Sequence, residues 1–247
     1  MATDAILTLD EVVSGYGKMT ILHGTSFSVA RGAITTVIGP NGAGKSTVFK
    51  TVFGMLPARA GRVTFEGAEI TNLQPRDLLT RGISYVPQGR KIFPELSVRH
   101  NLELGAVMAR KDFDLAGRMD AAMDRFPVLR RKANAQASTL SGGEQKMLEI
   151  ARALLLEPKL MMIDEPSIGL SPILVNELFA TLTGMRDRGI TVLMIEQNAK
   201  RALEKSDFGI VLELGSTRLQ DRAESILADP RIGQLFLGGG LESTPAA

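Results

Sequence analysis

The 247-residue sequence has no cysteine, only two histidines and no long apolar run. Without cysteine, the chain can have no disulfide, no thiolate nucleophile and no cysteine-bound zinc or iron–sulfur site. A membrane-spanning helix needs about 20 apolar residues, whereas the strongest run, Leu160–Ile163, ends at an acidic residue. The first twelve residues include Asp4, Asp10 and Glu11 but no basic residue, which is not typical of a secretory signal. We therefore expect neither a membrane span nor a signal peptide.

The sequence also has little net charge. Its 29 Lys and Arg residues nearly balance 27 Asp and Glu, giving a formal charge of +2. Nucleic-acid-binding surfaces carry a basic excess, so we expect no nucleic-acid partner. With 44% hydrophobic and 23% charged residues, the composition is that of a globular protein with a sizeable core.

Short apolar stretches alternate with helical patterns, which predicts an α/β fold with a largely parallel sheet. No strand is expected between about residues 97 and 156, a stretch rich in Ala, Met and Arg, which we interpret as a helical insertion. The expected strands are Ile6–Leu9, Thr25–Val29, Ala33–Ile38, Gly61–Phe65, Gly82–Val86, Leu160–Ile163, Thr191–Ile195 and Phe208–Leu212. The expected helices begin at Lys45, Gln74, Ser97 and Ala199, or cover Asp112–Phe126, Gly142–Leu156 and Pro172–Arg188.

These patterns predict a single domain over residues 1–247. Within it, residues 1–95 and 158–237 are expected to form an α/β core, and residues 96–157 a helical subdomain. The last residues, 238–247, begin with three glycines and are expected to be a flexible tail.

Residues 39–47 fit the phosphate-binding pattern G-x-x-x-x-G-K-[ST], with an apolar strand before them and a helical pattern after them. Glycines let backbone N–H groups converge on phosphate oxygens, and the helix N-terminus adds its positive end. We expect Lys45 to reach the β- and γ-phosphates, Ser46 to ligate Mg²⁺ and Thr47 to hydrogen-bond the inner phosphates. An ordinary glycine-rich turn is the alternative. The candidate nucleotide-binding residues are Gly39, Pro40, Asn41, Gly42, Ala43, Gly44, Lys45, Ser46 and Thr47.

Two carboxylates, Asp164 and Glu165, end the apolar stretch that begins at Leu160. Such a strand places Asp164 beside the phosphate loop, where it can hold Mg²⁺ through a water. Glu165 then lies one residue further on, where it can orient or deprotonate an attacking water. A strand ending in solvated acids is the alternative, but the presence of the phosphate loop favours the functional interpretation.

The hexapeptide Leu140–Gln145, L-S-G-G-E-Q, precedes a long amphipathic pattern and lies between the phosphate loop and the two carboxylates. It resembles the signature motif of ATP-binding cassette (ABC) ATPases. The resemblance implies a P-loop NTPase fold with a mostly parallel core sheet, an N-terminal antiparallel β region and an inserted helical subdomain. It also implies that Ser141, Gly142 and Gly143 form a second anion site, which contacts the γ-phosphate held by the opposite subunit.

The same resemblance assigns roles to other positions. Tyr16 lies where the family places an aromatic that stacks on adenine, and Gln88 matches the glutamine that senses Mg²⁺ and the attacking water. Gln197 stands in place of the family's switch histidine; its amide can donate a hydrogen bond to the γ-phosphate but cannot take up a proton near neutral pH. We therefore expect Gln197 to be a geometric sensor and Glu165 the general base, although Gln197 could simply cap the next helix. The expected Mg²⁺ ligands are Ser46, Gln88 and Asp164.

Three segments, Gly89–Pro94, Pro166–Pro172 and Glu196–Asn198, resemble the shorter ATP-binding subunit of branched-chain amino acid importers, with similar subunits serving urea, short amides and aromatic acids. This resemblance implies ATP and Mg²⁺ as cofactors and a location at the cytoplasmic face of the inner (plasma) membrane. The implied partners are a second ATP-binding subunit (a different cassette or a second copy), two permeases and, indirectly, an external solute-binding protein. The transported solute is not indicated.

Four apolar residues lie close together after Gln88, namely Ile92, Phe93, Pro94 and Leu96. They could line a groove that receives a short cytoplasmic helix of a permease, or they could pack the helical subdomain onto the core. Met147, Met161 and Met162 are expected in the core.

A soluble ABC-type ATPase of translation or DNA repair is the main alternative function. Such translation factors usually carry two cassettes, whereas this sequence has one phosphate loop and one signature. The repair ATPases contain long coiled coils, whereas only about 95 residues, without sustained heptads, separate Lys45 from Leu140. A small-molecule kinase would leave the hexapeptide and Glu165 without a role.

Overall fold

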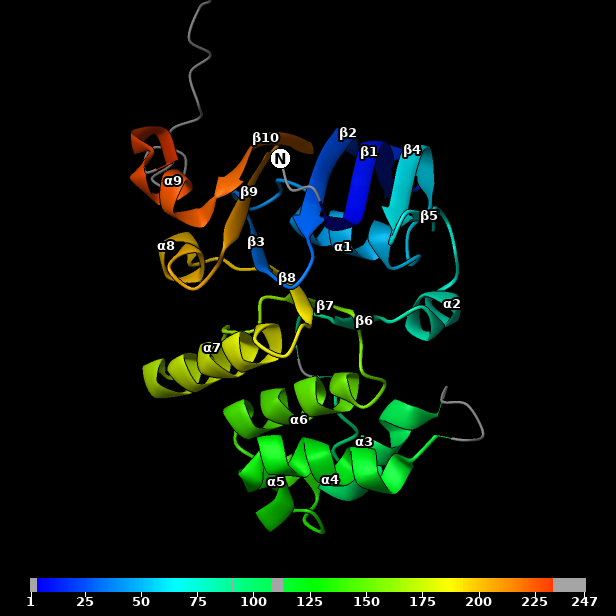
Figure 1. The fold of residues 1–247 in the computed structure, drawn as a ribbon, viewed down its shortest axis with the longest axis vertical. Helices are drawn as coiled ribbons and strands as arrows, with labels where there is room; N and C mark the ends of the chain where they lie inside the picture. Colours follow the sequence, from blue (N-terminus) through cyan, green and yellow to red (C-terminus); the bar gives the residue numbers. More distant parts are fainter. Residues whose placement is uncertain (1–3, 90, 108–112, 233–247) are drawn as a thin grey trace, which may run out of the picture.

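A computed structural model of the chain describes residues 4–89, 91–107 and 113–232, arranged as shown in Figure 1. A six-stranded core sheet runs through the middle of the molecule. A second sheet and α1 (Lys45–Val52) lie above it in that view, and a layer of helices lies below it. This is the expected α/β architecture. The expected tail, 238–247, lies outside the described residues.

The second sheet is antiparallel, has four strands in the order β2-β1-β4-β5 and forms the N-terminal part of the fold. Apolar side chains of β1, among them Leu7 and Leu9, are buried against Phe49 of α1. Pairing of β1 with β2 continues as far as Tyr16 and Met19, so both strands are longer than expected. The strands are β1 (Ala5–Tyr16), β2 (Met19–Ala30), β4 (Ala58–Phe65) and β5 (Ala68–Glu69).

The core sheet has the order β10-β9-β3-β8-β7-β6, and all its neighbouring strands are parallel except β10, which is antiparallel to β9. Both faces of the central strand β7 are buried: Leu160 and Met162 face α1, and Met161 and Ile163 face the helical layer. Strands buried on both faces read as continuous apolar runs, which explains why they were predictable. The strands are β3 (Ile34–Ile38), β6 (Ile83–Val86), β7 (Leu160–Asp164), β8 (Thr191–Ile195), β9 (Phe208–Glu213) and β10 (Ser216–Arg222).

The helical layer contains no strand within the described residues between 97 and 156. Ser97, Asp114 and Ser141 cap its helices by accepting hydrogen bonds from backbone N–H groups, which fixes where these helices begin. Met147 is partly buried against the apolar cluster beneath the core sheet. The helices are α3 (Val98–Glu103), α4 (Leu115–Arg125), α5 (Pro127–Arg131) and α6 (Gly142–Leu154), with 3₁₀ turns at Leu104–Ala106 and Ala137–Thr139.

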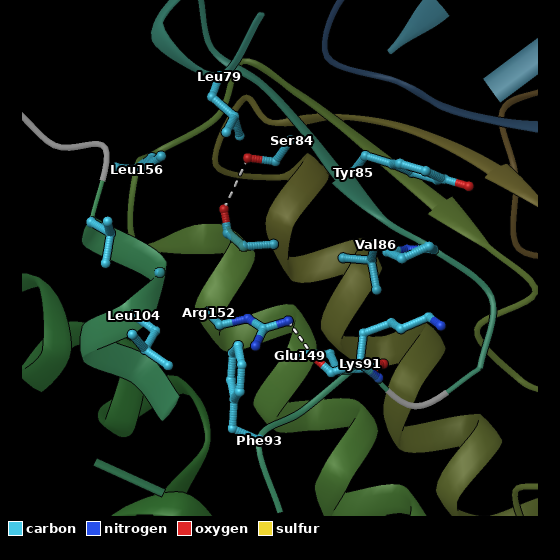
Figure 2. Close-up of a pocket in the computed structure, with 14 residues that line it drawn as sticks. Leu79, Ser84, Tyr85, Val86, Lys91, Phe93, Leu104, Glu149, Arg152 and Leu156 are labelled. Carbon is cyan, nitrogen blue, oxygen red and sulfur yellow. Dashed lines mark hydrogen bonds between the residues drawn. The ribbon is translucent and has the colours of Figure 1, made fainter. Parts of the chain in front are cut away.

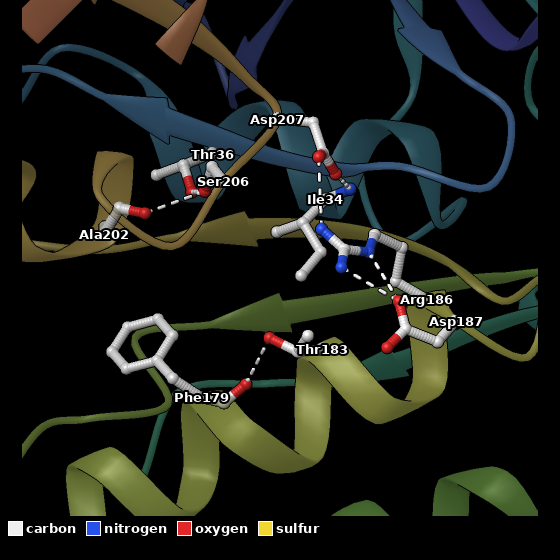
Figure 3. Close-up of polar contacts among 9 residues, drawn as sticks. All are labelled: Ile34, Thr36, Phe179, Thr183, Arg186, Asp187, Ala202, Ser206 and Asp207. Carbon is white, nitrogen blue, oxygen red and sulfur yellow. Dashed lines mark hydrogen bonds and ion pairs between the residues drawn. The ribbon is translucent and has the colours of Figure 1, made fainter. Parts of the chain in front are cut away.

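The remaining helices are α2 (Pro75–Thr80), α7 (Pro172–Arg186), α8 (Ala199–Leu203) and α9 (Ala223–Ala228). Figure 3 shows a polar cluster that fixes α7 at the amino ends of β3 and β9. Asp207 accepts hydrogen bonds from Arg186 (3.1 Å) and from the backbone N–H of Ile34 (2.8 Å). The hydroxyls of Thr36 and Ser206 lie 2.6 Å apart. This cluster holds the sheet at the edge opposite to the candidate site.

Candidate nucleotide-binding site

The phosphate loop connects the carboxyl end of β3 to α1. Gly42 and Gly44 have φ of +83° and +99°, which side chains rarely adopt, and a Cβ on Gly39 would lie 2.2 Å from a backbone oxygen of Leu212. No side chain caps the N-terminus of α1, so its first N–H groups are available to a ligand. The loop can therefore accept an anion such as a phosphate.

Lys45 is buried, and its ammonium group donates hydrogen bonds to the carbonyl oxygens of Gly39 (2.7 Å) and Pro40 (3.0 Å). Burial lowers the pKa of Lys45, while the nearby charges of Glu165 and Asp164 oppose that shift. Both carbonyl oxygens belong to the phosphate loop, so oxygens of a phosphate bound there could replace them as acceptors of the Lys45 hydrogen bonds. Thr47 is also buried at the start of α1.

Ser46, Asp164 and Tyr85 meet where the carboxyl end of β7 approaches α1. The Ser46 hydroxyl lies 3.5 Å from one carboxylate oxygen of Asp164, and the Tyr85 hydroxyl lies 3.3 Å from the other. Burial raises the pKa of Asp164, although both hydroxyls counteract it. Burial also raises the pKa of Tyr85, so this phenol is a neutral donor. Sequence analysis did not assign Tyr85 to the site.

Oxygen donors of this kind suit Mg²⁺, which is usually held by one or two carboxylates together with waters and substrate phosphates. Among the described residues, no three His, Cys, Asp or Glu side chains cluster into a cage for a metal ion. The hydroxyl of Ser46 and the carboxylate of Asp164 therefore fit a Mg²⁺ ion that also binds phosphate.

Glu165 follows β7 with φ of +48° and accepts hydrogen bonds from two side-chain amides. Gln88 donates over 2.5 Å, and Gln197 donates to both carboxylate oxygens over 3.3 and 3.4 Å. The structure thus brings Gln88, Glu165 and Gln197 together from three separate segments.

Glu196 links the loop after β7 to the loop after β8, and sequence analysis missed it. Its carboxylate is buried and accepts hydrogen bonds from the backbone N–H (2.9 Å) and the hydroxyl (2.7 Å) of Ser167. Burial raises the pKa of Glu196, and the two bonds from Ser167 oppose that rise. An acidic residue directly after an apolar strand was the available signal. These bonds fix the positions of the neighbouring Glu165 and Gln197.

Tyr16 ends β1, and 44% of its surface is exposed. Lys50 of α1 donates a hydrogen bond to its hydroxyl over 3.1 Å, and the ammonium lies 5.5 Å from the ring centre. An exposed ring beside the phosphate loop can stack on a base. The contact with Lys50 had no signal in the sequence.

Ser141, Gly142 and Gly143 start α6 in the helical layer, whereas α1 lies on the other side of the core sheet. None of the hydrogen bonds among the described residues joins these three residues to the phosphate loop. The structure therefore places the two proposed anion sites apart within one chain.

A groove of about 550 Å³ lies between β6 and α6 (Figure 2). Phe93, which is 50% exposed, lines this groove, whereas Ile92 packs against the helical cluster. Leu96 is partly buried and Pro94 is exposed. The lining residues are Leu79, Ser84, Tyr85, Val86, Pro87, Lys91, Phe93, Leu104, Gly105, Val107, Glu149, Arg152, Ala153 and Leu156.

Side chains of α6 hold the segment that carries Phe93. Glu149 accepts a hydrogen bond from the backbone N–H of Lys91, and Arg152 donates to the carbonyl oxygen of Lys91 over 2.5 Å. Lys146 donates to Glu149 (2.5 Å) and to the carbonyl oxygen of Gly89 (3.1 Å). The helix that starts with the signature residues is thereby bonded to the wall of the groove.

The chain is similar in sequence to ATP-binding proteins of known transporters. Residues 22–168 match the family described as ABC transporter. The chain is 41% identical over 234 residues to the high-affinity branched-chain amino acid transport ATP-binding protein BraG of Pseudomonas aeruginosa, covering 95% of this chain and 100% of that protein. It is 32% identical over 237 residues to the lipopolysaccharide export system ATP-binding protein LptB of Escherichia coli, covering 95% and 98% of the two chains.

Among solved structures, the chain resembles that of MJ1267, an ATP-binding cassette of an ABC transporter. The TM-score is 0.88 at 31% identity, covering 96% of this chain and 100% of that chain. The ADP conformation of the same cassette gives a TM-score of 0.84 with the same identity and coverage.

Proposed function

This chain belongs to the ABC transporter family and is an ATP-hydrolysing subunit of a transporter, and from this premise we propose that it powers the import of branched-chain amino acids or a related small polar solute. The observation that carries the catalytic part of the proposal is the meeting of Lys45, Asp164 and Glu165 with two side-chain amides at the carboxyl ends of β3, β6, β7 and β8. Ligands of open α/β sheets bind at this edge.

In the proposed mechanism, ATP binds with its base against Tyr16 and its phosphates in the loop 39–47. Lys45 exchanges the carbonyl oxygens of Gly39 and Pro40 for β- and γ-phosphate oxygens. Ser46, Gln88 and Asp164 would hold Mg²⁺, which neutralises phosphate charge when bound. Thr47 hydrogen-bonds the inner phosphates.

Glu165 is the proposed general base. It accepts a proton from the water whose oxygen attacks the γ-phosphorus, while the bond from that phosphorus to the β-phosphate oxygen breaks and ADP leaves. Gln88 and Gln197 already donate to this carboxylate, so small side-chain rotations could place their amides on the water and the γ-phosphate. Gln197 then senses the phosphate by geometry, since an amide does not take up protons near neutral pH.

The N-terminus of α6 is the proposed contact to ATP held by a second cassette. Its separation from the phosphate loop within this chain supports this assignment. Two cassettes would then close over two nucleotides, and hydrolysis would release them. The second cassette is either a different ATP-binding subunit or another copy of this chain.

The groove between β6 and α6 is the proposed seat for a cytoplasmic helix of a membrane permease. Its lining is mainly apolar, and α6 joins it to the signature residues through Glu149 and Arg152. No helix of the described residues is long and apolar enough to cross a bilayer. We place the chain at the cytoplasmic face of the inner membrane, held there by two permeases, with an external solute-binding protein as an indirect partner.

The importer assignment is supported by the 41% identity to BraG, a branched-chain amino acid transport protein. The chain is also similar to LptB, which is named for lipopolysaccharide export, so the test must distinguish import from export. The test is uptake of labelled leucine and of labelled urea by host cells that lack the gene. Uptake that is lost and then restored by the wild-type gene, but not by Lys45→Ala, supports import. Normal uptake together with an outer-envelope defect would contradict it.

A further inference from the structure

A carboxylate lies inside the signature segment, beside the proposed phosphate contact. Glu144 accepts a hydrogen bond from the backbone N–H of Ser141 (2.7 Å), and the Ser141 hydroxyl accepts one from the backbone N–H of Glu144 (3.4 Å). These reciprocal bonds form a capping box at the N-terminus of the 13-residue helix α6. A negative side chain suits a helix N-terminus, but it also competes there with an incoming anion.

Lys132, the residue after α5, neutralises that carboxylate. Its ammonium donates to both oxygens of Glu144, over 2.7 and 2.9 Å. Burial raises the pKa of Glu144, but the bonds from Lys132 and Ser141 outweigh it, so the net pKa is lowered and the carboxylate is ionised at neutral pH. The neighbouring Arg130 is engaged elsewhere, with Asp120 and Asp124.

We propose that Lys132 is a positioning residue that fixes Glu144 as the cap of α6 and cancels its charge, so that Ser141 and the backbone N–H groups of Gly142 and Gly143 can receive the terminal phosphate of the ATP held by the second cassette. This inference rests on the proposed function, because that function assigns the phosphate contact to residues 141–143. Lys132 acts through Glu144 and does not itself bind the nucleotide.

The physical basis is that an uncompensated charge weakens anion binding at a helix N-terminus. Without Lys132, the full negative charge of Glu144 would lie within the first turn of α6, where the incoming phosphate is also negative. The pair is partly exposed, with side-chain exposure of 40% for Lys132 and 16% for Glu144, so the protein should fold without it. The predicted effect is therefore on the affinity for ATP rather than on the fold.

The experiment measures ATP hydrolysis by the transporter complex purified through a tag on this chain, as KM for ATP and kcat. Lys132→Met is expected to raise KM by about fivefold, the size of a helix-terminal charge effect. Lys132→Arg, which keeps the charge, should retain low KM. The matched control is Arg131→Met. This variant removes the same charge from the exposed side chain of the preceding residue and should leave KM unchanged.

Rescue separates charge balance from simple structural support. In the double variant Lys132→Met, Glu144→Gln, the amide can still accept the hydrogen bond from Ser141 but carries no charge, so most of the lost affinity should return. A KM that stays at the wild-type value in Lys132→Met overturns the proposal, and so does a raised KM that Glu144→Gln fails to restore. If the methionine variant does not fold, Lys132→Gln carries the same test.

Ser141→Arg distinguishes failure of this inference from failure of the proposed function. A bulky cation at the start of α6 should abolish hydrolysis if residues 141–143 contact ATP. Unchanged hydrolysis in Ser141→Arg would remove the composite site and the inference with it. Lost hydrolysis in Ser141→Arg, combined with normal KM in Lys132→Met, would overturn only the role of Lys132.

Discussion

Replacing Glu165 with glutamine should separate ATP binding from ATP hydrolysis. The carboxylate accepts hydrogen bonds from Gln88 and Gln197, and an amide of the same shape can keep one of them but cannot take up a proton from water. Loss of a general base lowers a rate by about 10²–10⁴-fold. We therefore expect hydrolysis by Glu165→Gln to fall by a factor in that range.

ATP affinity should rise in the same variant. Removing one negative charge near the γ-phosphate relieves a repulsion, and a pair of charges about 4 Å apart near a protein surface interacts by roughly 4 kcal/mol as an upper limit. The variant should still fold, because losing one hydrogen bond to a charged group costs about 1.5–3 kcal/mol, less than the stability of a typical domain. The variant should thus accumulate in the ATP-bound, closed state.

The assay combines single-turnover phosphate release with equilibrium binding of labelled ATP. Glu204→Gln is the matched control, because this exposed glutamate on the surface loses the same charge away from the site. Hydrolysis near the wild-type rate in Glu165→Gln would refute the assignment of Glu165 as the base. An equal loss of hydrolysis in Glu204→Gln would show that the fall in rate does not depend on the position of the removed charge.

Three further predictions concern the phosphate loop, the metal site and the base contact. Lys45→Ala should weaken ATP binding by at least tenfold, since a charge-assisted bond contributes about 1.5–3 kcal/mol, and unchanged affinity in calorimetry would contradict the loop assignment. Asp164→Asn should raise the melting temperature at neutral pH, by about 2–4 °C for each kcal/mol, because burial raises the pKa of Asp164 and its ionised form destabilises the fold. This gain should shrink as the pH falls through the raised pKa of folded Asp164, and it should vanish below the lower pKa of the unfolded chain, where both states are protonated. A difference in melting temperature that stays constant with pH would contradict this prediction. Tyr16→Ala should weaken ATP binding by about 1–3 kcal/mol, whereas Tyr16→Phe should retain it. An equal loss of affinity in both variants would indicate that ATP binding depends on the hydroxyl bonded to Lys50 rather than on the ring.

Burial decided which elements the sequence could predict. Strands β7 and β8 are buried on both faces and appear as apolar runs, so their bounds were predicted to within one residue. Strand β10 (Ser216–Arg222) was missed because it is a mostly polar edge strand that pairs only with β9 in the core sheet. Helices α5 and α9, of five and six residues, were missed; neither has a side-chain N-cap, whereas the equally short α3 and α8, which were predicted, are capped by Ser97 and Asn198.

Local patterns also decided how much of the site was predictable. The phosphate loop and the carboxylates after β7 are contiguous motifs, and the structure brings both to one edge of the sheet. The contacts between them are not local: Gln88 and Glu165 are 77 residues apart, and Ser167 and Glu196 are 29 apart. Such contacts depend on how parallel strands align, so local patterns do not predict them; only the resemblance to ABC ATPases assigned Gln88 and Glu165 to the same attacking water.

The proposed seat for the permease is tested through Phe93, which is 50% exposed in the groove. Phe93→Asp should abolish binding to a permease by placing a charge in an apolar contact. Met55→Asp is the matched control, because Met55 is similarly exposed, at 55%, but does not line the groove. Equal retention of the permease by both variants would contradict the groove assignment.

The most direct test of the central claim is purification of the tagged chain from detergent-solubilised membranes of its host, with the accompanying chains identified by mass spectrometry. The account predicts recovery of a second ATP-binding cassette and two membrane permeases with the wild-type chain, and loss of the permeases with Phe93→Asp. Recovery of ribosomal or chromosomal proteins without any permease would contradict it.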